Sequence, residues 1–221
     1  ACADTAMATT LQQALRDAQT LGLARIDAQL LLLHTLGRDP NDRAWLLAHD
    51  TDPLEAGVAR TFAALCQRRV AGAPVAYLTG STAFYGLRLQ VDARVLDPRP
   101  DTETLVDWAL DVLRDQTAPH VLDLGTGSGA VALALQHQRP DAQVHAVDAS
   151  LDALAVAQAN AQRLALPVHF HAGSWCEALP DGAVFDAIVS NPPYVADGDP
   201  HLRALTHEPL SALTSGPDGL D

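Results

Sequence analysis

Cysteines that could pair, membrane-length apolar runs and basic side chains are all scarce in this chain of 221 residues. Cys2, Cys66 and Cys176 lie far apart and form no C-x-x-C pair. That spacing argues against a disulfide framework and against a zinc site, and it fits a reducing cytosol. No apolar run approaches membrane-spanning length, and no basic-then-apolar signal segment opens the chain. We therefore expect a cytoplasmic protein.

Positive charge is the clearest shortage. Lys and Arg together number 14 against 27 Asp and Glu, so the formal charge is −13. Such a field repels a phosphate backbone and argues against tight, non-specific binding to nucleic acid.

Hydrophobic residues make up 48% of the chain, which is enough to bury a core. The length fits one large domain, or a small domain followed by a medium one.

The N-terminal part of the chain has the apolar spacing of amphipathic helices, beginning with Leu11 to Leu21. Further helices are predicted over residues 26–36 and 43–48, and from Pro53 towards Arg69. After them, residues 83–91 alternate apolar and polar side chains, which is typical of a β-hairpin. Asp101 is predicted to be the N-cap of the next helix, with one buried face made of Leu105, Trp108, Ala109, Val112 and Leu113.

From Pro119 onwards, short apolar strands alternate with helices. Strands are predicted over residues 120–124, 143–147, 168–171 and 184–189, and helices over residues 128–138 and 151–164. This alternation indicates an α/β fold whose parallel sheet carries helices on both faces. A ligand is then expected at the carboxyl ends of the strands.

The first of these strands runs into Asp123-Leu124-Gly125-Thr126-Gly127-Ser128-Gly129. Glycines let the backbone turn tightly and let a ligand approach the free N–H groups of a helix N-terminus. Asp148, at the end of the second strand, can accept hydrogen bonds from ribose hydroxyls. A nicotinamide or flavin dinucleotide site would use the same parts, because the run also satisfies G-x-G-x-x-A with an acid about 20 residues further on.

The fourth strand is followed by Asn191-Pro192-Pro193-Tyr194. Each proline restricts the residue before it, so the Asn191 side chain and the Pro192 carbonyl are held in a narrow range of directions. Two such acceptors can grip a planar NH2 group. Asp123, two residues before the first glycine, can meet the amino end of a methionine, whereas a dinucleotide site more often has an apolar residue there. These two features favour S-adenosylmethionine as the ligand.

Taken together, the glycine loop, Asp148 and the tetrapeptide resemble the class I methyltransferases that modify planar amino or amide nitrogens. A closer resemblance, covering nearly the whole chain, is to the peptide chain release factor glutamine N5-methyltransferases of the HemK (PrmC) type. It rests on the helical N-terminal part, Phe84–Gly86, Pro98–Glu103, Trp175, Glu208-Pro209 and Gly216–Leu220. Ser174 and Asp97 depart from the family pattern, which has an acid and an apolar residue at these places.

This resemblance implies a Rossmann-like methyltransferase sheet in residues 98–221, a β-hairpin linker in residues 81–97 and a helical substrate-recognition domain in residues 1–80. It implies S-adenosylmethionine as cofactor, held by Asp123, Gly125, Thr126, Gly127, Ser128, Gly129, Asp148, Trp175 and Asn191. Asp148 would take the ribose, and Trp175 would lie near the adenine. The substrate would be the glutamine of the Gly-Gly-Gln motif in bacterial class I release factors. It would lie against Asn191, Pro192, Pro193 and Tyr194, of which Asn191, Pro192 and Tyr194 are the candidate catalytic residues.

Other interpretations stay open. A ribosomal-protein glutamine or the N6 of adenine in DNA would also present a planar NH2 group, although the acidic charge speaks against DNA. A non-catalytic nucleotide-binding module is a third possibility.

No metal is expected, because His169 and His171 share one face of a strand without a nearby Cys or carboxylate cluster. The strand over residues 184–189 is apolar on both faces, as central parallel strands are, so we expect further strands of the sheet to be missing from this chain.

Overall fold

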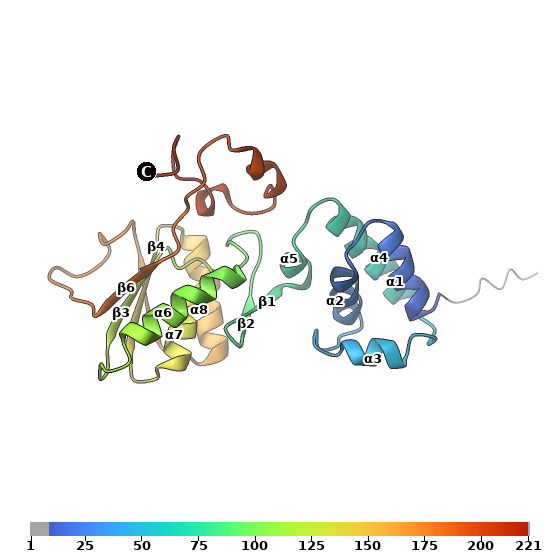
Figure 1. Cartoon of the computed structure of the whole chain (residues 1–221), viewed down its shortest axis with the longest axis horizontal. Helices are drawn as coiled ribbons and strands as arrows, with labels where there is room; N and C mark the ends of the chain where they lie inside the picture. Colours follow the sequence, from blue (N-terminus) through green and yellow to red (C-terminus); the bar gives the residue numbers. More distant parts are fainter. Residues whose placement is uncertain (1–8, 221) are drawn as a thin grey trace, which may run out of the picture. The chain divides into compact units, whose positions relative to one another are not determined.

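The computed structural model describes residues 9–220. The chain divides between Thr79 and Gly80 into two compact units, which we call the helical unit and the sheet unit. The helical unit consists of α1 (Leu11–Thr20), α2 (Arg25–Thr35), α3 (Arg43–Ala48), α4 (Ala56–Val70) and α5 (Val75–Thr79), as Figure 1 shows. Its core is centred on α2, where Leu31, Leu32 and Leu33 are all fully buried.

Helix α4 begins three residues later than its sequence predicts. The N-cap is Glu55, and the backbone before it pairs with the segment that precedes α1. Pro53 forms a bridge with Thr10, and the N–H of Leu54 donates to the carbonyl oxygen of Thr9 at 2.7 Å. The prediction of a start at Pro53 was therefore wrong, because a tertiary pairing holds this proline in extended backbone.

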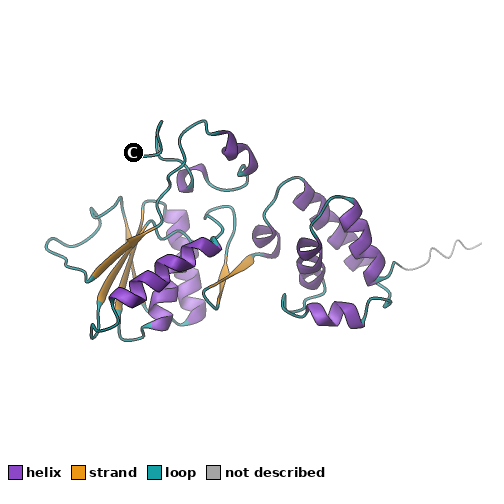
Figure 2. Cartoon of the chain, in the orientation of Figure 1, coloured by secondary structure: helices purple, strands orange, loops and turns teal. Residues whose placement is uncertain are grey.

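The sheet unit opens with an antiparallel hairpin of β1 (Ser81–Phe84) and β2 (Leu87–Gln90), as predicted. Four parallel strands follow, and hydrogen bonding gives their order as β5-β4-β3-β6. They are β3 (His120–Leu124), β4 (Gln143–Asp148), β5 (Val168–Ala172) and β6 (Ala187–Ser190). Strands are drawn in orange in Figure 2. The helices of this unit are α6 (Glu103–Val112), α7 (Ala130–Gln138) and α8 (Leu151–Leu164), with 3-10 turns η1 (Pro100–Thr102), η2 (Pro200–Ala204) and η3 (Leu210–Ala212). The predicted strand and helix alternation is confirmed.

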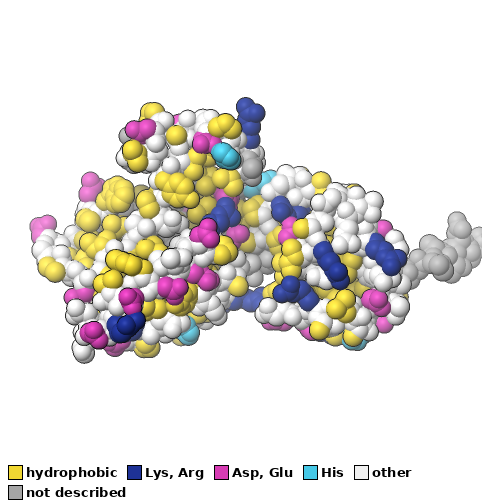
Figure 3. Space-filling view, in the orientation of Figure 1, with side chains coloured by type: hydrophobic (Ala, Val, Ile, Leu, Met, Phe, Trp, Pro, Cys, Tyr) yellow, Lys and Arg dark blue, Asp and Glu magenta, His cyan; other side chains and the backbone are white. Residues whose placement is uncertain are grey.

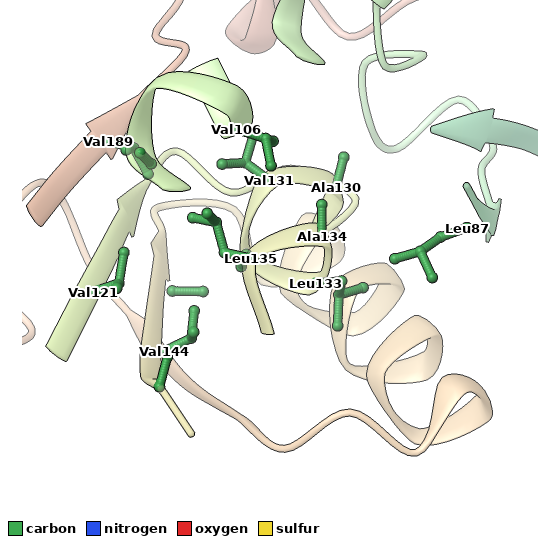
Figure 4. Packing of buried hydrophobic residues seen from close by; sticks show 14 of the residues in the cluster. Leu87, Val106, Val121, Ala130, Val131, Leu133, Ala134, Leu135, Val144 and Val189 are labelled. Carbon is green, nitrogen blue, oxygen red and sulfur yellow. The ribbon is translucent and has the colours of Figure 1, made fainter. Parts of the chain in front are cut away.

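All three helices pack on one face of the sheet, where they form the main core of the unit. Figure 4 shows Val121, Val144 and Val189 of the sheet facing the side chains of α7. The opposite face, at Leu122, Leu124 and Val147, is covered by side chains from the connection between β5 and β6, namely Ala178, Leu179 and Phe185. The prediction of helices on both faces was wrong for the described residues. This connection is rich in residues that favour turns, such as Gly173, Pro180 and Gly182.

Helix α6 differs from its prediction at its start and in its buried face. Its N-cap is Thr102, because Pro100–Thr102 forms a 3-10 turn that places Asp101 one position too early. The helix buries Val106 and Ala109 and leaves Trp108 exposed. Figure 3 shows hydrophobic side chains gathered on the surface over this helix. Among the described strands β6 pairs with β3 alone, and its Ile188 is 53% exposed.

Candidate functional site

The glycine loop after β3 is built from left-handed backbone. Gly125, Gly127 and Gly129 have φ values of +72°, +56° and +83°, a region that other residues adopt only with strain. The N–H groups of Gly125 and Thr126 both donate to the carbonyl oxygen of Val147, at 2.9 and 3.0 Å. The loop is thus tied to the end of β4 and starts α7 at Ala130, two residues later than predicted.

The three glycines differ in what surrounds their Cα atoms. A Cβ on Gly125 or Gly127 would meet no heavy atom within 4 Å, and both residues line a cavity at the carboxyl end of the sheet. A Cβ on Gly129 would lie 3.1 Å from Cδ1 of Leu133 and 3.2 Å from Cβ of Ala157. Gly125 and Gly127 therefore form an open cradle for a ligand, whereas Gly129 allows α7 and α8 to pack closely.

We call the space over this cradle the glycine-loop cavity. Asp123 lines it, although only 2% of the residue is exposed. Its Oδ2 accepts hydrogen bonds from Oγ1 of Thr126 at 2.7 Å and from the N–H of Ala132 at 3.2 Å. Burial raises the pKa of Asp123 to about 6. Within the described residues Oδ1 has no hydrogen-bond donor, so it is available to a cationic ligand.

Asp148 closes the glycine-loop cavity at the end of β4. Its Oδ2 accepts a hydrogen bond from the N–H of Gly127 at 2.8 Å, and its Oδ1 accepts one from the N–H of Ser150 at 2.9 Å. Each carboxylate oxygen has lone pairs to spare, so both can accept a further hydrogen bond from a ligand hydroxyl. The two backbone donors fix the direction in which the carboxylate faces.

The tetrapeptide leaves β6 at the same end of the sheet. The Oγ of Ser190 donates to the carbonyl oxygen of Leu124 at 2.8 Å, which fixes the exit of this strand against β3. Nδ2 of Asn191 donates to Oγ1 of Thr102 at 3.4 Å. Within the described residues neither Oδ1 of Asn191 nor the carbonyl oxygen of Pro192 accepts a hydrogen bond. Neither proline has an N–H, so two acceptors stand free where no backbone donor competes.

A second cavity lies under the tetrapeptide and is lined by Asn191, Pro192, Pro193 and Tyr194 together with Arg99, Asp101 and Thr102. We call it the tetrapeptide cavity. Five residues line both this cavity and the glycine-loop cavity and so form the boundary between the two, namely Leu96, Thr102, Asn191, Pro193 and Ala212. A group bound on one side of Asn191 would therefore lie next to a group bound on the other.

Trp175 and Tyr194 line a third, adjoining cavity together with Asp148. Trp175 has left-handed backbone, with φ of +48°, and both rings are largely exposed, Tyr194 by 73%. Trp175 and Asp148, which are predicted to contact the adenine and the ribose, therefore line the same cavity. Gly219 packs closely against the backbone of Tyr194, because a Cβ on this glycine would lie 2.5 Å from the carbonyl oxygen of Tyr194.

The histidines form a cluster away from these cavities. Nδ1 of His145 lies 2.9 Å from Nε2 of His171, and the ring of His145 stacks on that of His169. Burial lowers the pKa values of His145 and His171. No group of three or more His, Cys, Asp or Glu among residues 9–220 could hold a metal ion. In the same range no helix is long and apolar enough to cross a membrane.

Four residues near the site, Arg99, Thr102, Glu103 and Glu208, have no site role predicted from the sequence. The sequence points to Arg99 and Glu103 only as members of the Pro98–Glu103 run, and it predicts no contact for either. Instead, Nη2 of Arg99 donates to both carboxylate oxygens of Glu208, at 2.7 and 2.8 Å, and Oε1 of Glu103 accepts the N–H of Tyr85 at 2.8 Å. Thr102 was read only as part of the Pro98–Glu103 run. That run and Glu208-Pro209 were the available signals, but neither reveals the contacts between them.

Comparison with known proteins supports a specific family. Residues 102–215 match the family model "Methyltransferase small domain", and residues 8–80 match "PrmC N-terminal domain". The chain is 52% identical over 201 residues to the "Release factor glutamine methyltransferase" of Bordetella pertussis, which covers 90% of this chain and 73% of that protein. The protein of the same name from Xylella fastidiosa strain 9a5c is 50% identical over 211 residues, covering 94% and 75%. That from Escherichia coli K12 is 43% identical over 213 residues, covering 95% and 75%. The chain therefore belongs to the release factor glutamine methyltransferase family.

Proposed function

We propose that this protein transfers a methyl group from S-adenosylmethionine to the side-chain amide N5 of the glutamine in the Gly-Gly-Gln motif of bacterial class I release factors. One observation carries the proposal. Asn191, whose side-chain oxygen accepts no hydrogen bond within the described residues, lines both the glycine-loop cavity with its two carboxylates and the tetrapeptide cavity, and Pro192 lines the tetrapeptide cavity beside it. Membership of the family supplies the substrate class. A cytoplasmic location belongs to this proposal and fits the few, widely spaced cysteines of the chain.

The residues present fit S-adenosylmethionine. The open cradle over Gly125 and Gly127 admits a ligand to the backbone, and two carboxylates suit its cationic and hydroxyl groups. Asp123 would hold the ammonium of the methionine part, Asp148 the ribose hydroxyls, and Trp175 the adenine. When bound, the cofactor supplies a methyl group on a positively charged sulfur. Thr126 and Ser128 are both buried, and Thr126 acts by holding the Asp123 carboxylate.

The protein's part in the reaction is to position a poor nucleophile. An amide nitrogen shares its lone pair with the carbonyl group, so it must be presented in a fixed direction. Oδ1 of Asn191 and the carbonyl oxygen of Pro192 accept its two hydrogens and aim the nitrogen at the glycine-loop cavity. Both acceptors also stabilise the positive charge that develops on the nitrogen. Tyr194 packs against the flat amide, and the proton leaves after transfer, when the nitrogen has become acidic.

The test is transfer of labelled methyl from S-adenosylmethionine. The substrates are a release factor, its Gly-Gly-Gln variant with the glutamine replaced by Ala, a ribosomal-protein fraction and duplex DNA. We expect label in the release factor alone. Label in the Gln-to-Ala variant or in DNA would overturn the proposal. The sheet unit makes DNA an unfavourable substrate, since residues 80–221 carry 19 acidic side chains against 7 arginines.

Substitutions of Gly125 and Gly129 are expected to affect different properties: cofactor affinity for Gly125 and stability for Gly129. Gly125→Ala places a methyl group in the open cradle, so we expect the affinity for S-adenosylmethionine to fall by about tenfold or more, with about 1 kcal/mol of backbone strain. Gly129→Ala adds close contacts with Leu133 and Ala157 to a similar strain, so we expect a larger loss of stability, about 2 kcal/mol. Calorimetric titration and thermal unfolding of both variants measure the two effects. Equal stability losses with equal affinity losses would contradict this division.

Asp123 predicts a pH dependence of cofactor binding. Burial holds its pKa at about 6, so below that pH the free protein carries a neutral carboxyl group. An ammonium binds the ionised form, so the affinity is nearly full at pH 7, is about halved at pH 6 and is about tenfold lower at pH 5 than at pH 7. Titration calorimetry at several pH values measures it, and proton release on binding is expected near pH 6. The Asp123→Asn variant should bind weakly with little dependence on pH. An unchanged affinity of the native protein at pH 5 would refute this role.

A further inference from the structure

We propose that Thr102, held in place by the Arg99–Glu208 ion pair, is a positioning residue that keeps the side-chain amide of Asn191 in its reactive orientation. This inference rests on the proposed function. It assigns a role in that site to residues outside the tetrapeptide and the glycine loop.

The contact between Thr102 and Asn191 lies where the two cavities meet. Nδ2 of Asn191 donates to Oγ1 of Thr102 at 3.4 Å, and both residues line both cavities. A side-chain amide has an acceptor at one end and donors at the other. When Oδ1 of Asn191 accepts a hydrogen from the substrate NH2 group, Nδ2 needs an acceptor of its own in this half-buried place. Among the described residues Thr102 supplies it.

Within the described residues, the hydroxyl of Thr102 makes no hydrogen bond other than the one with Asn191. Thr102 is the N-cap residue of α6, yet its side chain accepts no capping hydrogen bond from this helix. The contact with Asn191 is the one hydrogen bond of this hydroxyl within residues 9–220. Replacing the hydroxyl therefore leaves the helix cap unchanged and alters the neighbour of Asn191 alone.

The Arg99–Glu208 ion pair anchors the backbone segment that leads into Thr102. Its N–H donates to the carbonyl oxygen of Arg99 at 3.0 Å. The guanidinium of Arg99 donates to both oxygens of Glu208, whose side chain is only 1% exposed. Pro98 and Pro100 flank Arg99 and restrict the backbone of this segment. Glu208 lies 106 positions further along the chain than Thr102, so the ion pair fixes the wall of the tetrapeptide cavity through tertiary structure.

The direct test compares three threonine variants of the full chain. Thr102→Val keeps the shape and removes the acceptor, Thr102→Ser keeps the hydroxyl, and Thr104→Val changes an exposed threonine two residues further along α6. We expect Thr102→Val to lower kcat for release-factor methylation by about tenfold, with KM and the Kd for S-adenosylmethionine changed less than about twofold. Thr102→Ser and Thr104→Val should retain most of the native kcat.

A second measurement is independent of turnover. The side-chain NH2 resonances of Asn191, assigned by their loss in Asn191→Ser, report the hydrogen bond to Thr102 directly. We expect them to shift in Thr102→Val and in Glu208→Gln, and to stay in place in Thr102→Ser and Thr104→Val. Unmoved resonances in either of the first two variants would overturn the proposal, as would a native kcat in Thr102→Val. If the native protein methylates no release factor, the proposed function fails, and the resonances still decide the role of Thr102.

Discussion

Replacing Asn191 by Ala is expected to lower kcat for release-factor methylation by about 10² to 10³-fold, while the Kd for S-adenosylmethionine changes by less than about threefold. The side-chain oxygen of Asn191 is free in the structure and stands at the boundary of the two cavities. This oxygen is therefore placed to interact with the substrate amide nitrogen as that nitrogen gains positive charge. Interactions that strengthen in the transition state affect the chemical step more than they affect binding. Single-turnover kinetics and titration calorimetry separate the two quantities.

The control for this prediction is a change of the neighbouring aromatic ring. Tyr194 lines the tetrapeptide cavity but is 73% exposed. Tyr194→Phe keeps the flat surface that packs on the amide, so we expect a loss of less than about threefold in kcat. If Asn191→Ala weakened cofactor binding as much as it slowed turnover, the asparagine would serve binding only. The mechanism would then lose its principal acceptor.

Removing the partner of a buried charge is expected to have a large effect on stability. In Arg99→Ala the Glu208 carboxylate, with a side chain 1% exposed, would lose its cation. Breaking a buried pair in this way costs about 3 to 5 kcal/mol, but Arg99 is 42% exposed and partly hydrated, so we expect about 2 kcal/mol. For a unit of this size that corresponds to a Tm lower by about 6 °C. Urea and thermal unfolding of the full chain measure it.

The pH dependence of this loss has a definite sign. Burial already raises the pKa of Glu208, and removing Arg99 raises it further. A carboxyl group with a raised pKa in the folded protein destabilises the fold once the unfolded chain has ionised, above about pH 4.3. The destabilisation by Arg99→Ala should therefore be small near pH 4 and grow as the pH rises to neutrality. Glu208→Ala, which leaves a half-exposed guanidinium, should cost less, and the double variant should cost less than the sum. A loss that does not vary with pH would show that the ion pair is not its source.

Local patterns predicted most of the elements. Helices α3 and α8 have the bounds expected from the sequence, and all four parallel strands lie where their apolar runs do. The errors at helix starts have two causes. Pro53 lies opposite Thr10 in a β-bridge, which is outside the window in which helical periodicity is read. Asp101 is displaced from the N-cap of α6 by a local 3-10 turn, which the capping pattern alone does not distinguish from the first turn of the helix.

The candidate site was predicted in part. The glycine loop, Asp123, Asp148 and the tetrapeptide were singled out from their places at strand ends, because parallel strands bring their carboxyl ends to one edge. Their roles in binding and catalysis stay predictions. Gly129 is grouped with the cofactor-binding glycines, and that role stays a prediction. The structure adds that a Cβ on Gly129 would meet Leu133 of α7 and Ala157 of α8, a contact that only tertiary packing reveals.

By itself the sequence determined the local chemistry of this protein: glycines where the backbone turns left-handed, carboxylates at two strand ends, and an asparagine stiffened by two prolines. These depend on residues adjacent in the chain, and so on short-range sterics and periodicity. The tertiary structure alone decided how that chemistry is tuned. It buried Asp123 and raised its pKa to about 6, joined Arg99 to Glu208, and placed Thr102 against Asn191. Burial, ion pairing and contact between distant segments are properties of packing, and no pattern along the chain encodes them.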